Sequence, residues 1–189
     1  MIGITLPYLS FETDVDFLLT KQKIIHLRHW RYAFYCHILF SIFSLTAGLT
    51  QFSGYMLHKH KGVHRAMGYV YVLDVICLAG PSGLIMAFYA NGTVVSKTSF
   101  VLLSLLWIGF TALALVKAIK KDFRAHQAWM IRSFALTLSA ITLRMLALVL
   151  PHIVHLDART EYALIAWLSW LLNLLIAEWI IYAKKLSTA

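Results

Sequence analysis

The chain has 189 residues, of which 60% are hydrophobic and 13% are charged, and its mean hydropathy is +0.74. A soluble globular domain is about 45–50% apolar and about 25% charged, so this composition argues against a soluble enzyme and a disordered chain. The net charge of +9 comes from basic residues that flank apolar segments. Positive charges are distributed in this way around membrane spans, so we expect a lipid bilayer as partner and no nucleic acid.

Residues 1–31 are predicted to form an extramembrane or interfacial segment, with an interfacial helix from Val15 onward, because their apolar stretches are too short to span. A spanning helix needs about 20 predominantly apolar residues. Five segments of the remaining bundle, residues 32–185, qualify: 33–56, 67–90, 98–116, 128–150 and 162–183. The loops are short and no segment alternates with a period of two, so we predict an all-α integral membrane helical bundle with five transmembrane helices. Lys and Arg are more numerous on the side of the 57–66 and 117–127 loops, which places the N-terminus outside and the C-terminus inside.

Polar residues recur along one face of the first span. At about 100° per residue, its stripe lies within roughly 40° of one line and consists of His37, Ser41, Ser44, Gly48, Gln51 and Tyr55. The fourth span carries a similar stripe of His126, Ser133, Thr137 and Arg144, with Arg132 on another face. We expect the stripes to face the interior of the bundle; close packing of small residues is the alternative explanation.

Ionisable and amide side chains inside a membrane are costly, and each is therefore a candidate for function. The intramembrane set comprises Asp74, Arg144, Asn173 and Glu178. At 1.5 Å per residue, Glu178 lies at the same depth as Arg132, which predicts an ion pair. Asp74 and Asn173 lie together near the midplane, where Asp74 either pairs with Asn173 or stays protonated. A purely structural role for these polar layers remains an open alternative.

The histidines indicate a haem site as one hypothesis, because axial ligation needs imidazoles at equal depth on neighbouring helices. His64 and His126 match in depth, His37 is a third candidate ligand, and Arg132 would lie near the propionates. Haem b is therefore the candidate cofactor, and a quinone or a proton relay would use the same groups. His58, His60 and His64 share a short loop without a carboxylate, so we expect no separate metal site.

Three stretches resemble motifs of a known family. Residues 64–71 read HRAMGYVY and resemble HR-x-x-G-x-x-Y, residues 122–133 read DFRAHQAWMIRS and resemble D-x-x-x-H-x-x-WMIRS, and residues 170–178 fit W-x-x-N-x-x-x-x-E. Together they resemble the bacterial predicted membrane proteins filed as domain of unknown function 2306, over residues from about 30 to 183. The resemblance implies a multi-pass protein of the bacterial inner (cytoplasmic) membrane and implies no particular reaction.

The resemblance also indicates which positions belong to the family's pattern: His37, His64, Arg65, Gly68, Tyr71, His126, Trp129, Arg132, Arg144, Asn173 and Glu178. Gln127 departs from it, since a second basic residue would be usual there. Members of the family often carry one more N-terminal hydrophobic segment, whose absence here would fit a truncated gene start.

Three functions follow as hypotheses, and the sequence leaves open whether any is enzymatic. The first is a membrane redox protein that binds haem b or quinone. The second is a proton-coupled small-molecule transporter or channel, with a path lined by His37, Asp74, Arg144 and Glu178. The third is a structural or accessory subunit, for which a second copy of the chain or another membrane protein would be the partner.

Overall fold

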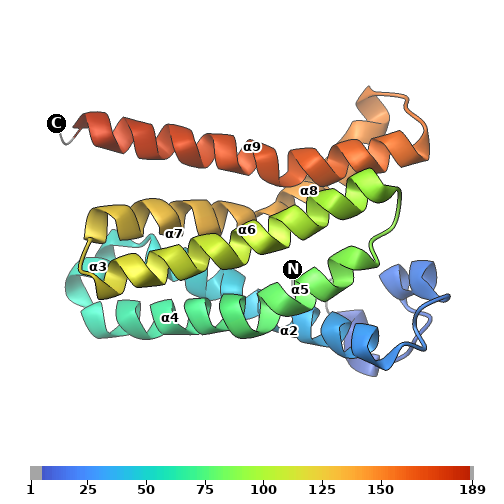
Figure 1. Ribbon diagram of the computed structural model, residues 1–189, viewed down its shortest axis with the longest axis horizontal. Helices are drawn as coiled ribbons and strands as arrows, with labels where there is room; N and C mark the ends of the chain where they lie inside the picture. The colour runs from blue at the N-terminus through green and yellow to red at the C-terminus, as the bar shows by residue number, and fades with distance from the viewer. Residues whose placement is uncertain (1–5, 188–189) are drawn as a thin grey trace. The chain divides into compact units, whose positions relative to one another are not determined.

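The computed structural model describes residues 6–187, so residues 1–5 of the predicted N-terminal segment lie outside the described residues. The chain divides into two compact units, the first ending at Met86 and the second beginning at Ala87. Residues 6–187 contain helices and no strand (Figure 1). Five helices are long and apolar enough to cross a membrane: Arg28–Gln51, Lys61–Phe88, Val94–Ile119, Phe123–Ile153 and Ala158–Lys184. The predicted all-α class with five spans is thereby confirmed.

The first span, α2 (Arg28–Gln51), ends five residues before the expected limit at Met56. Ser53 has an extended backbone, and its hydroxyl accepts the Met56 N–H at 3.4 Å. This cap starts a separate short helix, α3 (Gly54–Lys59), so a serine within an apolar run ends the span earlier than hydropathy alone predicts.

The second span is continuous but not uniformly α-helical. It consists of α4 (Lys61–Leu73), the π-helical segment η3 (Asp74–Ala79) and α5 (Gly80–Phe88). In η3 the Gly80 N–H bonds the Val75 carbonyl, five residues back. Pro81 follows. Because proline has no backbone N–H, it cannot donate a hydrogen bond to a carbonyl in the preceding turn of the helix.

In the first unit, the residues before α2 pack on its beginning through aromatic rings. They form two short 3₁₀ helices, η1 (Leu6–Ser10) and η2 (Asp16–Lys21), the second lying where a helix from Val15 onward is expected. Tyr8 meets Phe34 edge-on at 5.2 Å between centroids, and Phe17 stacks on the same ring at 6.1 Å. Phe34 is consequently buried although it lies near the start of a spanning helix.

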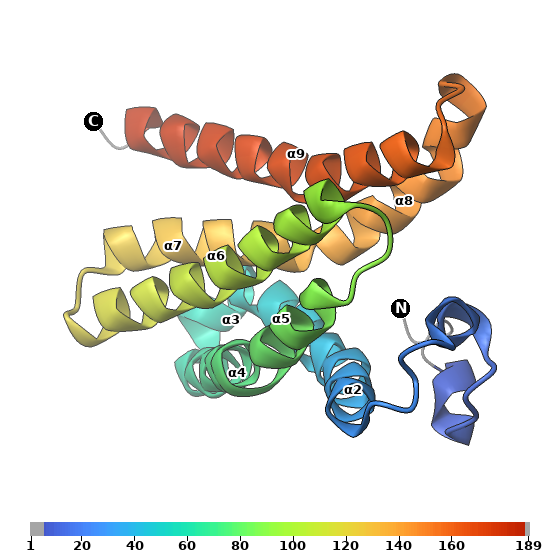
Figure 2. The ribbon, with the colours of Figure 1, turned by 45° about the vertical axis from the view of Figure 1, so that its right-hand side comes forward.

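The second unit contains α6 (Val94–Ile119), α7 (Phe123–Thr137), α8 (Ser139–Ile153) and α9 (Ala158–Ser187). The fourth span is thus divided at Leu138 into α7 and α8. Figures 1 and 2 show α9 passing along α8 and then α7, both of which it contacts. Its contact with α7 forms a small apolar core of Ile131, Ala135, Ala177 and Ile181.

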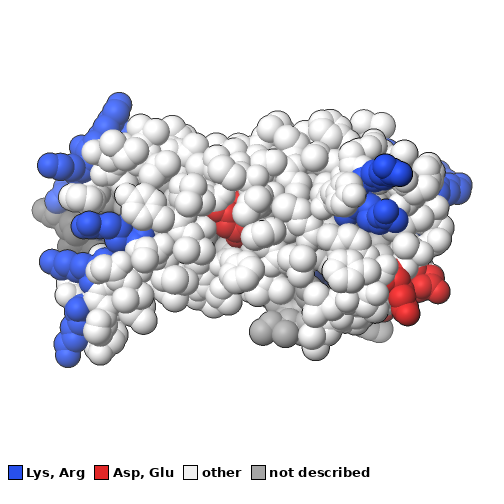
Figure 3. All heavy atoms as spheres, turned by 90° about the horizontal axis from the view of Figure 1, so that it is seen from below, with Lys and Arg blue, Asp and Glu red and all other residues white. Residues whose placement is uncertain are grey.

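Charged residues mark the ends of the helices. On the face shown in Figure 3, Lys and Arg atoms gather toward the two sides of the view, and the surface between them is mostly uncharged apart from an acidic group near the middle. Examples of basic residues at helix ends are Lys61 at the start of α4 and Lys117 in the last turn of α6. Arg132 and Arg144 depart from this distribution because they lie within α7 and α8.

Candidate functional site

Part of the polar stripe predicted for the first span faces the second span, whereas Tyr55, its last predicted member, lies in α3 and is exposed. Three side chains of the stripe, spaced seven residues apart, donate to the second span: His37 Nδ1 to the Ala79 carbonyl (2.8 Å), the Ser44 hydroxyl to Asp74 Oδ2, and Gln51 Nε2 to the His64 carbonyl (3.1 Å). Seven residues are close to two helical turns, so the three bonds follow one line along α2. Spacing in the sequence was enough to predict the line, whereas its partners come from the fold.

Gly68 of the family pattern has a structural explanation in the same contact. A Cβ atom at this position would lie 3.2 Å from Gln51 Oε1. Glycine therefore lets Gln51 reach the backbone of α4 and donate to the His64 carbonyl. The close approach of the two helices is the physical reason for a small residue here.

Asp74 is the most enclosed acidic group of the first unit, with 4% of its surface exposed. It lies where α4 passes into the π-helical segment η3. Its Oδ2 accepts from Ser44, whereas Oδ1 has no hydrogen-bond partner among the described residues. Asn173, which the sequence suggested as a partner because it lies at a similar depth, forms its hydrogen bonds within the second unit instead.

The stripe of α7 is arranged on α6 in the same manner. His126 Nδ1 lies 2.8 Å from the Ala114 carbonyl, Ser133 Oγ lies 2.6 Å from Thr111 Oγ1, and Trp107 Nε1 donates to Thr137 Oγ1 at 3.0 Å. The predicted inward orientation of this stripe is confirmed for these three members. Arg144, the fourth, lies beyond the division at Leu138, where its guanidinium donates to the Ala140 carbonyl of its own helix at 2.7 Å.

His37 and His126 thus share an arrangement, one in each unit. In each, Nδ1 faces a main-chain carbonyl, which can only accept, so Nδ1 carries the proton of the neutral ring. The lone pair then lies on Nε2. A histidine that ligates a metal commonly has this form, because the bond at the far nitrogen fixes both tautomer and ring orientation. His64, in the first turn of α4, is joined to the network through its carbonyl.

Arg132 and Glu178 form the ion pair that depth predicts. Arg132 Nε lies 2.5 Å from Glu178 Oε1, and its Nη2 lies 2.8 Å from Oε2, so the two groups meet through parallel bonds. The guanidinium carbon also lies 4.7 Å above the centroid of Trp129. Arg132 is therefore held between a carboxylate and an aromatic face, which accounts for three positions of the WMIRS and W-x-x-N-x-x-x-x-E motifs together.

Asn173 holds the two halves of the fourth span. Its Nδ2 donates to the Ala135 carbonyl of α7 at 3.1 Å, and its Oδ1 accepts from the Thr142 hydroxyl of α8 at 3.0 Å. Leu138, where the helix divides, lies between these two contacts. A side chain bonded to the backbone at a helix break is a recognised cause of such a break. We therefore assign Asn173 a structural position at the division.

Two aspartates outside the spans act as helix caps. The Ala125 backbone N–H, bonded to Asp122 Oδ1 at 3.1 Å, holds the pKa of that carboxyl below its usual range. The hydroxyl and N–H of Thr160 do the same for the pKa of Asp157 at the start of α9. Both carboxylates are therefore charged at neutral pH, where they stabilise the positive ends of α7 and α9.

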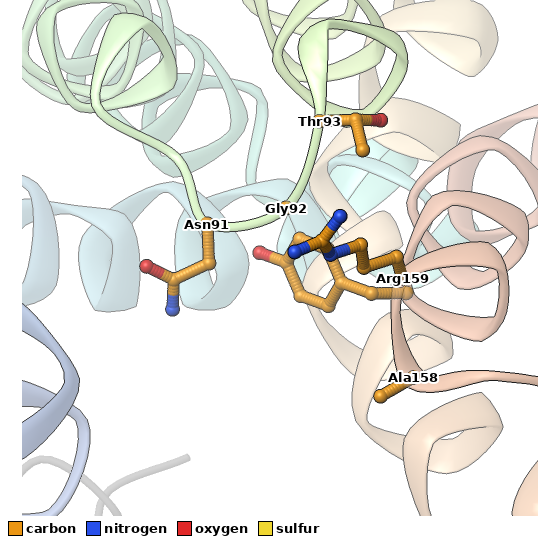
Figure 4. A pocket seen from close by; sticks show the side chains of 6 residues that line it. Asn91, Gly92, Thr93, Ala158 and Arg159 are labelled. Atoms are coloured by element: carbon orange, nitrogen blue, oxygen red, sulfur yellow. The ribbon is translucent and has the colours of Figure 1, made fainter.

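An open pocket of about 510 Å³ lies beside the loop that precedes α6. Figure 4 shows Asn91 on one side of it and Ala158 and Arg159, from the start of α9, on the other. The lining also includes Gly92, Thr93 and Tyr162, so no residue of the predicted site takes part. Gly92 has a φ of +82°, and a Cβ there would lie 2.8 Å from the Tyr162 ring, so the turn depends on glycine.

Several groups of these networks have no distinctive pattern in the sequence. Thr111 and Trp107 lie in the predicted span 98–116, which contains no charged residue, and nothing in their spacing distinguished them from packing residues. Gly80 and Pro81 indicate a bend in the second span, but nothing in the sequence specified that the turn before them is π-helical. Among the described residues, no group of three or more His, Cys, Asp or Glu side chains is placed to hold a metal ion.

Comparison with known proteins supports the resemblance found in the motifs. Searches of curated proteins and of solved structures gave no match. The sequence profile of one family, described as "Predicted membrane protein (DUF2306)", matches residues 34–181. This range contains all five apolar helices in whole or in large part, together with every motif position named above. The chain therefore belongs to the DUF2306 family of predicted membrane proteins.

Proposed function

We propose that this membrane protein is a redox protein of the bacterial inner membrane that holds haem b through histidine Nε2 atoms. The observation that supports the proposal is the tautomer of His126, fixed by its 2.8 Å bond to the Ala114 carbonyl. His37 has the same arrangement with Ala79, and His64 remains a further candidate ligand from the sequence. The proposed orientation, from the distribution of basic residues, has the N-terminus outside and the C-terminus inside.

The tautomer favours haem over a quinone carbonyl. An iron ligand needs a lone pair, which Nε2 of a neutral Nδ1–H imidazole provides. A quinone carbonyl accepts hydrogen bonds, and this nitrogen of the neutral ring has no proton to donate. The hydrogen bond from Nδ1–H to the Ala114 carbonyl also raises the basicity of the imidazole, so Nε2 donates its electron pair more strongly to a metal. When bound, haem would supply a one-electron carrier, and the part of His126 is to bind the iron and hold its position.

Arg132 is not included in the proposed cofactor site. Its guanidinium is already neutralised by the two oxygens of Glu178 and lies on the Trp129 ring. A propionate would have to displace that carboxylate. We therefore assign Arg132 to the ion pair, and the cofactor proposal depends on the histidines alone.

The test is an ultraviolet–visible spectrum of the protein purified in mild detergent from haem-replete cells, oxidised and then reduced with dithionite. We expect a Soret band that shifts on reduction and that His126→Ala abolishes. His58→Ala is the matched control, because His58 is an exposed histidine of α3 and should leave the band unchanged. A flat visible spectrum from folded protein, or a full band in the His126→Ala variant, would refute the proposal.

A further inference from the structure

The second span carries a carboxyl group at its centre. Asp74 lies 13 residues after Lys61 and 14 residues before Phe88, the two ends of this span. At 1.5 Å per residue, about 20 Å of helix separates it from either end. Only 4% of the Asp74 surface is exposed, so the residue has almost no contact with water or lipid headgroups.

Within residues 6–187 the observed ion pairs involve Asp122 and Glu178, and neither includes Asp74. Of the titratable groups on the elements packed around it, those closest to η3 in the contacts and along the chain are Cys36, His37 and Tyr71, while Cys77 of η3 itself is exposed. Cys36 and His37 of α2 approach the carbonyls of Leu78 and Ala79 at the far end of η3, and Tyr71 of α4 is fully buried one turn before it. A charged carboxylate at such a depth without a counter-charge is unfavourable, whereas a carboxylic acid is not.

Ser44 is suited to both protonation states of Asp74. Its hydroxyl, which is fully buried, is bonded to Oδ2. A hydroxyl accepts a hydrogen bond from a carboxylic acid and donates one to a carboxylate, so a rotation of one O–H bond adapts the contact. In the acid form Oδ2 carries the proton and Oδ1 is an ordinary carbonyl oxygen. Oδ1 has no hydrogen-bond partner among the described residues. Burying an unpartnered carbonyl oxygen costs far less free energy than burying an unpartnered carboxylate oxygen.

The backbone beside Asp74 is also unusual. π-Helical turns are rare and occur often at functional sites, and η3 begins at this residue. The stripe of α2 continues from Ser44 through Ser41 to His37, over about 10 Å of helix. We propose that Asp74 and Ser44 form a membrane-embedded proton-binding site that exchanges its proton through this polar face of α2. Such a site goes beyond haem binding and would serve either electron transfer or coupled transport.

Infrared difference spectroscopy tests the proposal on the full chain in phosphatidylcholine vesicles. We expect the carbonyl stretch of a protonated carboxylic acid at neutral pH, its loss in Asp74→Asn, and its shift when the vesicles are transferred to D₂O. Asp157→Asn is the control, because that exposed aspartate is charged at neutral pH and contributes no such band. Ser44→Ala should keep the band but move it to higher frequency, since the bond to Oδ2 is lost.

If the Asp74→Asn variant does not fold, isotope labelling of the wild-type protein provides a second measurement. Wild-type protein grown with carboxyl-¹³C aspartate should show the same band at lower frequency, which assigns it to an aspartate without any substitution. A band absent from the wild type, insensitive to the label, or unchanged in D₂O would overturn the proposal. None of these readings depends on haem, so failure of the redox proposal and failure of the proton site are distinguishable.

Discussion

Separating Arg132 from Glu178 should destabilise the protein more than removing both charges. The side chains are 21% and 52% exposed, within helices that are apolar enough to span a membrane. Much of that exposed surface therefore faces lipid and not water, which gives the pair little dielectric screening. Each single substitution leaves an unpaired charge there, whereas the double variant Arg132→Met with Glu178→Gln leaves none.

The magnitude follows from depth. Glu178 lies six residues before Lys184, where the span ends, which corresponds to about 9 Å of helix. An unpaired charge at the centre of a spanning helix costs about 2.5–3.5 kcal/mol on insertion scales, and less toward the surface. With a half-thickness of about 15 Å, roughly half of that cost applies. We expect a coupling energy of about 1–2 kcal/mol, above the 0.2–1 kcal/mol that is typical of pairs in water.

The assay is reversible unfolding in mixed detergent micelles, measured for the wild type, both single variants and the double variant. Their four free energies of unfolding give the coupling energy directly. Lys117 and Asp122 provide a control cycle, because this pair lies outside the apolar part of the spans at 3.3 Å and should show much weaker coupling. Additive single effects, or equal coupling in both cycles, would refute the reasoning.

Three further predictions concern helix contacts. Gly68→Leu should lower the thermal stability in detergent, because the added side chain displaces Gln51 from α4, whereas Gly68→Ala should be tolerated, since only the flexible end of Gln51 must move. Asn173→Leu removes two interhelical bonds of about 0.6 kcal/mol each and should lower the free energy of unfolding by about 1 kcal/mol. Asp122 has a lowered pKa through the Ala125 N–H, so its stabilisation of α7 is present at neutral pH and is lost as the pH falls through that pKa. Melting temperatures measured from neutral to acidic pH should fall less in Asp122→Ala than in the wild type; an equal fall would contradict this.

The sequence already contained the positions of the spans. A helix inside a bilayer satisfies its own backbone hydrogen bonds, so an apolar run of sufficient length determines a spanning helix with little help from its neighbours. The α2 stripe was predictable for a similar reason, because the 3.6-residue period places His37, Ser44 and Gln51 on one side. Depth along the helix also sufficed to pair Arg132 with Glu178, since long side chains tolerate an uncertain rotation.

Short side chains show where such reasoning stops. Depth placed Asp74 beside Asn173, yet Ser44 is the partner of Asp74, and Asn173 holds α7 to α8. An aspartate or asparagine reaches only its immediate neighbour, so its partner depends on which helix lies alongside and how it is rotated. The tautomer of His126 likewise depends on its contact with Ala114 of a neighbouring helix. The sequence determined which segments enter the membrane and which of their faces are polar, because both are properties of a single helix. Only the tertiary structure decided which polar groups meet, because that requires the packing of one helix on another.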